Sequence, residues 1–99
     1  MDDLEVPHRM TNPPPEEIAV RLHRAMDAAV GLPDTDIANI QLLIDAGERL
    51  VAFETLCTQI FEFEIALPPE RVRDLEALGE VLGANHGLTD CLWEDTADM

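Results

Sequence analysis

Two amphipathic segments joined by a short proline-containing link dominate the pattern of apolar and polar residues. In the segment that follows Gly47, apolar residues recur at steps of three and four, the spacing that places side chains on one face of an α-helix. This expected apolar face comprises Leu50, Phe53, Leu56, Cys57, Ile60 and Phe61. The segment after the link repeats the spacing with Val72, Leu75, Leu78, Gly79 and Leu82.

The link between these segments, residues 63–69, predicts a tight turn between two antiparallel helices. Pro68 and Pro69 cannot continue a helix, but they suit the first turn of the next one. The alternation of aromatic and acidic residues over 61–65 resembles a strand. We interpret it as the end of a helix, because an isolated strand has nothing to pair with.

Two more helices are predicted in the first half of the chain, over residues 16–30 and 36–46. Glu16 and Glu17 suit the positive end of the first helix dipole. The first apolar stripe comprises Ile18, Leu22, Ala25, Met26 and Ala29. The second helix is expected to be capped by side-chain oxygens of Asp34, Thr35 and Asp36. Its inward residues are expected to be Ile37, Ile40, Leu43 and Ile44.

The sequence therefore predicts an all-α fold, a small four-helix bundle over residues 13–84. It is preceded by a disordered leader, residues 1–12, and followed by an acidic tail, residues 85–99, in which Leu88, Leu92 and Trp93 offer a short packed turn. A chain of 99 residues forms one small domain. The predicted core comprises Ile18, Leu22, Met26, Ile40, Ile44, Phe53, Leu56, Cys57, Ile60, Leu75, Leu78 and Leu82.

The charge balance limits the classes of partner that the protein can bind. The chain has 21 acidic and 6 basic residues and a net charge of −15, which excludes direct binding to nucleic acid phosphates. No Lys or Arg occurs between Leu50 and Glu70 or after Arg73. Such a one-signed surface either keeps the protein soluble or speeds its encounter with a basic partner.

The start of the chain lacks the basic and apolar regions of a signal peptide, and no apolar run is long enough to cross a membrane. We therefore expect a cytoplasmic location without membrane association, whether translation starts at Met1 or at Met10. Cys57 and Cys91 fit that reducing compartment, and we expect Cys57, on the apolar face of its helix, to be a buried free thiol and not part of a disulfide.

No catalytic motif is recognisable, so we expect neither an enzyme nor a cofactor. His23, His86 and Cys91 lack the close pairing of metal ligands. Cys57 with His86 is a poor nucleophilic pair, because the thiol falls on an apolar stripe. The positions of Gly79 and Gly83 suit helix packing and helix ending, not phosphate binding.

Two sets of residues between positions 47 and 84 follow the pattern of a known protein family. Those in the first helix are Gly47, Glu48, Ala52, Glu54, Leu56, Cys57, Ile60, Phe61 and Glu62. Those that follow are Glu64, Ile65, Leu67 and the pairs Leu78-Gly79 and Leu82-Gly83. With these residues, the segment resembles the MafI-type small helical immunity proteins of bacterial polymorphic toxin systems. Pro68 stands where the family has a Ser-like cap. The resemblance implies a helical fold and an inhibitor of a secreted toxin; some members are encoded with RNA-cleaving EndoU-type toxins.

Two functions follow as hypotheses. The first is an immunity protein that neutralises a cognate toxin, expected to be a nuclease, by covering or distorting its basic active site. The alternative is a small acidic adaptor or regulatory module without a nuclease partner, and the oligomeric state stays open. The expected partner-binding residues are exposed acids and two apolar anchors, namely Glu54, Glu62, Phe63, Glu64, Glu80, Trp93, Glu94 and Asp95.

Overall fold

The computed structural model describes residues 14–96, apart from the side chain of Asp95, and the predicted leader lies outside this range. Helix α2 spans Pro15–Ala28, α3 Asp34–Asp45, α4 Arg49–Glu62 and α5 Pro69–Leu82. A short helix α6, Gly87–Asp90, continues into a 3-10 helix η2, Cys91–Asp95. No strand occurs between residues 14 and 96, so the predicted all-α fold with four main helices is confirmed.

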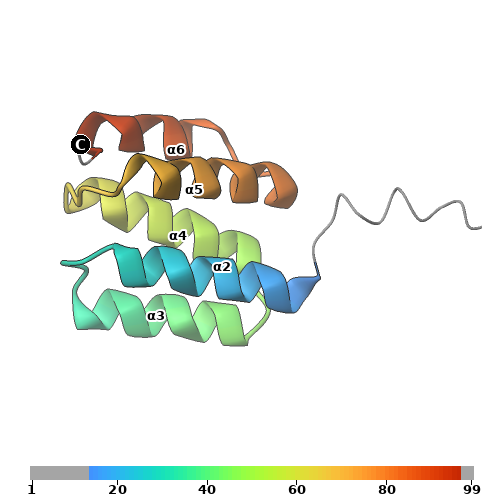
Figure 1. Ribbon diagram of the computed structural model, residues 1–99. Helices are drawn as coiled ribbons and strands as arrows, with labels where there is room; N and C mark the ends of the chain where they lie inside the picture. The colour runs from blue at the N-terminus through green and yellow to red at the C-terminus, as the bar shows by residue number, and fades with distance from the viewer. Residues whose placement is uncertain (1–13, 97–99) are drawn as a thin grey trace, which may run out of the picture.

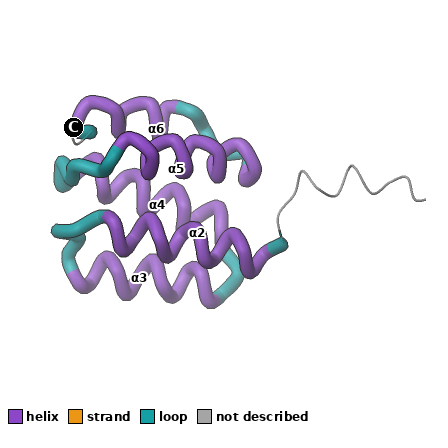
Figure 2. Tube along the Cα trace, in the orientation of Figure 1, coloured by secondary structure: helices purple, strands orange, loops and turns teal. Residues whose placement is uncertain are grey.

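Successive helices run in opposite directions and stack side by side, with α3 at one edge and α6 at the other (Figure 1, Figure 2). Helix α4 is the centre of the bundle, because it contacts α2, α3, α5, α6 and η2. Helix α2 also packs against α5. The predicted antiparallel pairing of α4 and α5 is confirmed, since the chain reverses at residues 63–68 (Figure 1).

All predicted core residues are buried except Leu82, which is half-buried and packs against the same cluster. The structure adds residues from the connections: Leu32 before α3, Ile65 and Leu67 between α4 and α5, and Leu92 in η2. Burial of Leu92 means that the carboxyl-terminal segment closes over α4 and α5 and belongs to the bundle.

Three residues predicted to face the core do not. Leu50 and Phe61 on α4 and Ile37 on α3 are all more than a third exposed. Phe61 follows Ile60 by one residue, which turns it by about 100° around the helix axis. The inward arc of α4 is already filled, because Ala52, which was not among the predicted core residues, is fully buried there.

The predicted cap of the second helix is also wrong. Pro33 occupies the N-cap position, and no side chain makes a capping hydrogen bond. Helix α3 therefore starts at Asp34, two residues earlier than expected, and Asp34 and Asp36 lie within its first turn. There they favour the helix through its dipole.

Two glycines at the end of α5 have the expected structural roles. A Cβ atom at Gly79 would lie 3.0 Å from Cζ of the buried Phe53, so this position allows α4 and α5 to approach closely. Gly83 ends the helix with a φ of 76°, and the amide of Ala84 donates to the carbonyl of Gly79 at 2.9 Å. This is the glycine-terminated helix end that the sequence predicts.

Candidate functional site

The carboxyl end of α4 presents acidic and aromatic side chains together. Glu62 and Glu64 are exposed, Phe63 is 48% exposed and Phe61 is 39% exposed. Phe61 was not among the expected binding residues, because its spacing suggested a core position. Large aromatic groups left in solvent beside charged groups are typical of surfaces that bind other proteins.

The backbone at this helix end adopts a conformation that usually requires glycine. The amide of Glu64 donates to the carbonyl of Phe61, and the amide of Ile65 donates to the carbonyl of Ile60, both at 3.0 Å. Glu64 has a φ of 52°, in the left-handed region that disfavours residues with a Cβ atom. The buried Ile65 anchors the turn, and Glu62, Phe63 and Glu64 are thereby held in solvent.

The exposed side of α4 continues this surface towards the start of the helix. Leu50, Glu54, Thr58 and Phe61 follow one another at steps of three and four and share one face. We call these four residues the outer stripe of α4. Glu54 is half-buried, Thr58 is exposed, and Leu50 is at the border of exposure. Val51, 42% exposed, lies beside the stripe.

Trp93 is 38% exposed, but its side chain also contacts other residues of the protein. Its indole N–H donates to Oε2 of Glu76 at 2.7 Å, and Cζ of Arg73 lies 5.7 Å from the centre of the ring. Trp93 therefore fastens η2 to the middle of α5. Glu94 is exposed beside it, and the side chain of Asp95 lies outside the described part of the structure.

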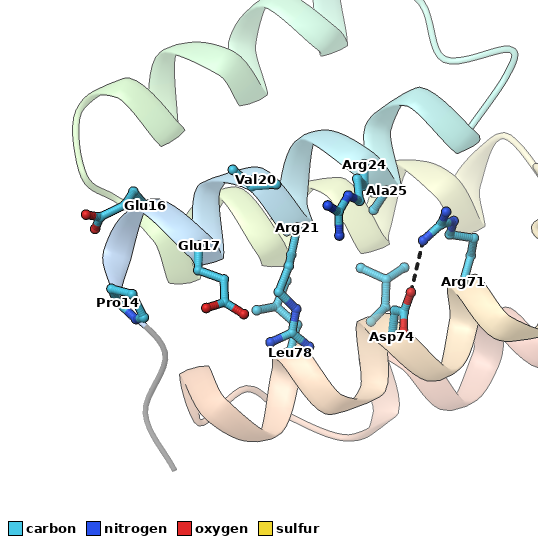
Figure 3. Close-up of a pocket in the computed structure, with 11 residues that line it drawn as sticks. Pro14, Glu16, Glu17, Val20, Arg21, Arg24, Ala25, Arg71, Asp74 and Leu78 are labelled. Carbon is cyan, nitrogen blue, oxygen red and sulfur yellow. Dashed lines mark hydrogen bonds and ion pairs between the residues drawn. The ribbon is translucent and has the colours of Figure 1, made fainter. Parts of the chain in front are cut away.

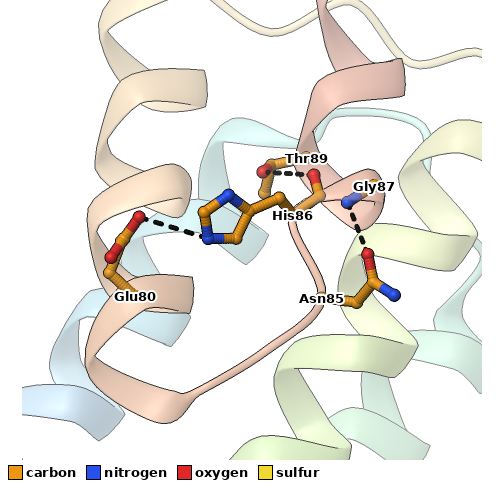
Figure 4. Close-up of polar contacts among 5 residues, drawn as sticks. All are labelled: Glu80, Asn85, His86, Gly87 and Thr89. Atoms are coloured by element: carbon orange, nitrogen blue, oxygen red, sulfur yellow. Dashed lines mark hydrogen bonds and ion pairs between the residues drawn. The ribbon is translucent and has the colours of Figure 1, made fainter.

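Glu80 lies apart from the end of α4, near the end of the antiparallel α5. Its Oε2 atom is 3.3 Å from Nε2 of His86, and both side chains are mostly exposed (Figure 4). Within the next turn, Thr89 Oγ1 donates to the His86 carbonyl at 3.2 Å, and the Gly87 amide donates to Asn85 Oδ1 at 2.7 Å (Figure 4). A small hollow of about 220 Å³ lies between α5 and α6 here.

The expected binding residues thus fall in three places. Glu62, Phe63 and Glu64 form one group at the end of α4, with Glu54 on the outer stripe. Trp93 and Glu94 lie over α5, and Glu80 lies near the α5–α6 connection. Only the first group combines exposed acids with an exposed aromatic residue that has no hydrogen-bonded internal role.

A groove between α2 and α5 was not anticipated from the sequence. It has a volume of about 600 Å³ and is lined by charged residues of both helices above an apolar floor (Figure 3). Arg71 Nη1 lies 3.0 Å from Oδ2 of Asp74 on its rim. Hydrophobic periodicity does not reveal this groove, because the groove depends on arginines that only the packing of α2 against α5 brings together.

Cys57 and Cys91 are thiols that form no disulfide, and Cys57 is fully buried. Burial raises the pKa of the Cys57 thiol to about 12, and the nearby Cys91 adds to the effect. Cys91 is half-buried, and its thiol donates to the carbonyl of Leu88 at 3.5 Å. A thiol that stays protonated and has no access to solvent is a core side chain and a poor nucleophile.

Among residues 14–96, no group of three or more His, Cys, Asp or Glu side chains is arranged to hold a metal ion. None of the helices in that range is sufficiently long and apolar to span a membrane. Comparison of the chain with protein-family models, with curated proteins and with solved structures finds no match.

Proposed function

We propose that this protein is an immunity protein that binds a basic toxin domain, a nuclease, through the carboxyl end and outer stripe of α4. The observation that carries the proposal is the pair of exposed phenylalanines, Phe61 and Phe63, alternating with the exposed acids Glu62 and Glu64. Apolar anchors surrounded by charged residues supply affinity and specificity in many protein interfaces.

Glu62 and Glu64 both occupy positions where they lower the stability of the fold, so a stabilising role does not explain them. Glu62 is the last residue of α4, where the helix dipole is negative, and an acid there costs about 0.3–1 kcal/mol. Glu64 holds a left-handed conformation that costs about 1–2 kcal/mol for residues other than glycine. Departures from local stability rules at one exposed point are typical of functional surfaces.

Electrostatics supports a basic partner. The net charge is −15, and the stretch from Leu50 to Glu70, which includes all of α4 except its first residue, Arg49, has no Lys or Arg. A nuclease must present a basic cleft to bind phosphates. An acidic surface attracts such a cleft over a distance and then competes with the nucleic acid for it. The resemblance of residues 47–84 to MafI-type immunity proteins supports the same partner class.

The test is co-expression with the toxin domain that the proposal expects to be encoded beside the gene for this chain. We expect the chain to rescue cells from that domain and to purify with it as a complex. Binding without loss of toxin activity would favour the adaptor hypothesis, in which an acidic module holds a basic partner without inhibiting it. A lack of both rescue and complex would refute the proposal.

A further inference from the structure

The groove between α2 and α5 has the dimensions of a site for a small molecule. Its volume of about 600 Å³ falls within the usual range of about 300–1,000 Å³ for ligand pockets. Ala25, Leu75 and Leu78 lie beneath it, and Val20, 47% exposed, forms part of one wall. Such a groove can cover the apolar part of a ligand.

The basic residues of the groove lie towards one end, where Asp74 is paired with Arg71 (Figure 3). Glu16 and Glu17 lie at the opposite end, beside the start of α2. Arg24 and Arg71 lie at the basic end and come from opposite helices, and Arg21 reaches from α2 over Leu78 between the two ends. The basic end is therefore an exception on a chain with a net charge of −15.

The basic end has spare hydrogen-bond donors. Arg71 is engaged with Asp74 at 3.0 Å. Within residues 14–96, neither Arg21 nor Arg24 makes a side-chain hydrogen bond or ion pair. Arg21 and Arg24 are three residues apart on α2, so both lie on the side of the helix that borders the groove. Each guanidinium is a planar fork that matches a carboxylate group.

We propose that this groove binds a small apolar ligand that bears one carboxylate. Arg21 and Arg24 bind the carboxylate, and the apolar body lies against Val20 and the floor formed by Leu75 and Leu78. A single negative charge suits the groove better than a phosphate dianion, because the carboxylates of Glu17 and Asp74 lie in the same groove. This site is separate from the proposed partner-binding surface, so each proposal can fail without the other.

The experiment is a titration of the full chain with octanoate, followed by amide chemical shifts in two-dimensional NMR. Octanol, which lacks the charge, and acetate, which lacks the apolar body, serve as comparison ligands. We expect octanoate to shift amides of α2 and α5 around the groove and to bind at least tenfold more tightly than either comparison ligand.

Two variants test the role of the arginines. Arg24→Gln and Arg21→Gln should each weaken octanoate binding by about tenfold, which corresponds to about 1.4 kcal/mol. Both side chains lie at the surface of α2, so the helical circular dichroism spectrum should not change. Arg49→Gln is the matched control, because Arg49 lies on α4 outside the groove, and it should bind octanoate as the parent chain does.

Several results would overturn the proposal. Equal affinity for octanol would mean that the arginines do not recognise the charge. Equal affinity for acetate would mean that the floor contributes nothing. Shifts confined to other helices, or no saturable shifts at all, would show that the groove is not the binding site.

Discussion

Raising the pH above about 9 should destabilise this protein through one side chain, the thiol of Cys57. This thiol is fully buried in α4, and burial raises its pKa from the ordinary 9.0 to about 12 in the folded chain. In the unfolded chain it ionises near its ordinary value. The folded state therefore retains a proton that the unfolded state loses, and its stability falls as the pH rises from about 9 towards about 12.

The size of the effect follows from the difference between the two pKa values. Between them, the free energy of unfolding falls by about 1.4 kcal/mol for each pH unit. At about pH 10.5 the loss relative to neutral pH is about 2 kcal/mol. This is a large share of the roughly 5–15 kcal/mol that stabilises a typical domain.

The composition of the chain makes the measurement unusually clear. The sequence has no tyrosine and no lysine, and arginine side chains stay protonated in proteins. The side chains other than cysteine that ordinarily titrate between about pH 9 and 11 are therefore absent, so a loss of stability in this range points to a thiol. Urea unfolding followed by circular dichroism should show a midpoint about 1 M lower at about pH 10.5 than at neutral pH.

Replacement of Cys57 by Ala provides the decisive comparison. Cys57→Ala should be less stable at neutral pH, because it loses a buried contact, but its stability should change little between neutral and alkaline pH. Cys91→Ala, the matched control, should retain the alkaline loss, because burial of Cys57 is the main cause of the raised pKa. An alkaline loss that persists in Cys57→Ala would refute the assignment to this thiol.

Three further predictions concern stability and are checked by urea unfolding of each variant. Gly79→Ala should lower the free energy of unfolding by about 1 kcal/mol, because the added methyl group would lie 3.0 Å from Phe53 and the overpacking cost of about 1–3 kcal/mol exceeds the gain in helix propensity; an unchanged midpoint would contradict this close contact. Glu64→Gly should raise it by about 0.5–1 kcal/mol, since glycine adopts the left-handed conformation without steric cost, and a loss of stability would disprove the inferred strain. Trp93→Phe should lower it by about 1 kcal/mol through loss of the indole hydrogen bond to Glu76, whereas a neutral result would mean that this bond does not fasten η2.

The helices and most of the core could be predicted because they depend on local patterns. Spacing at three and four residues identified the buried faces of all four main helices, and Pro68 and Pro69 marked the start of α5. The same rule was wrong for Phe61, because it lies next to Ile60 at the edge of the apolar arc. Only the packing of neighbouring helices decides which side of such an edge is covered.

The groove and the position of Trp93 could not be predicted, because they depend on residues far apart in the sequence. Arg24 and Arg71 line the same groove only because α2 packs against α5. Trp93 meets Glu76 only because η2 folds back over α5. Neither pairing leaves a periodic signal. The exposure of Glu62 and Phe63 could be inferred from their polar surroundings. The left-handed turn at Glu64 that holds them could not.

The proposed binding surface is tested most directly by the kinetics of association with the toxin domain that the proposal expects to be encoded beside the gene. Changing Glu62 and Glu64 together to Lys should slow association about tenfold at low salt, and salt should reduce the difference, because screening acts over about 8 Å at physiological ionic strength. Phe63→Ala should mainly speed dissociation.

The matched control reverses Asp27 and Asp45, two exposed acids in the last turns of α2 and α3. It makes the same change in net charge away from the α4 surface, so our account predicts a much smaller change in association rate. The account is contradicted if the Glu62 and Glu64 reversal binds as the parent chain does at every salt concentration, or if both reversals slow association equally.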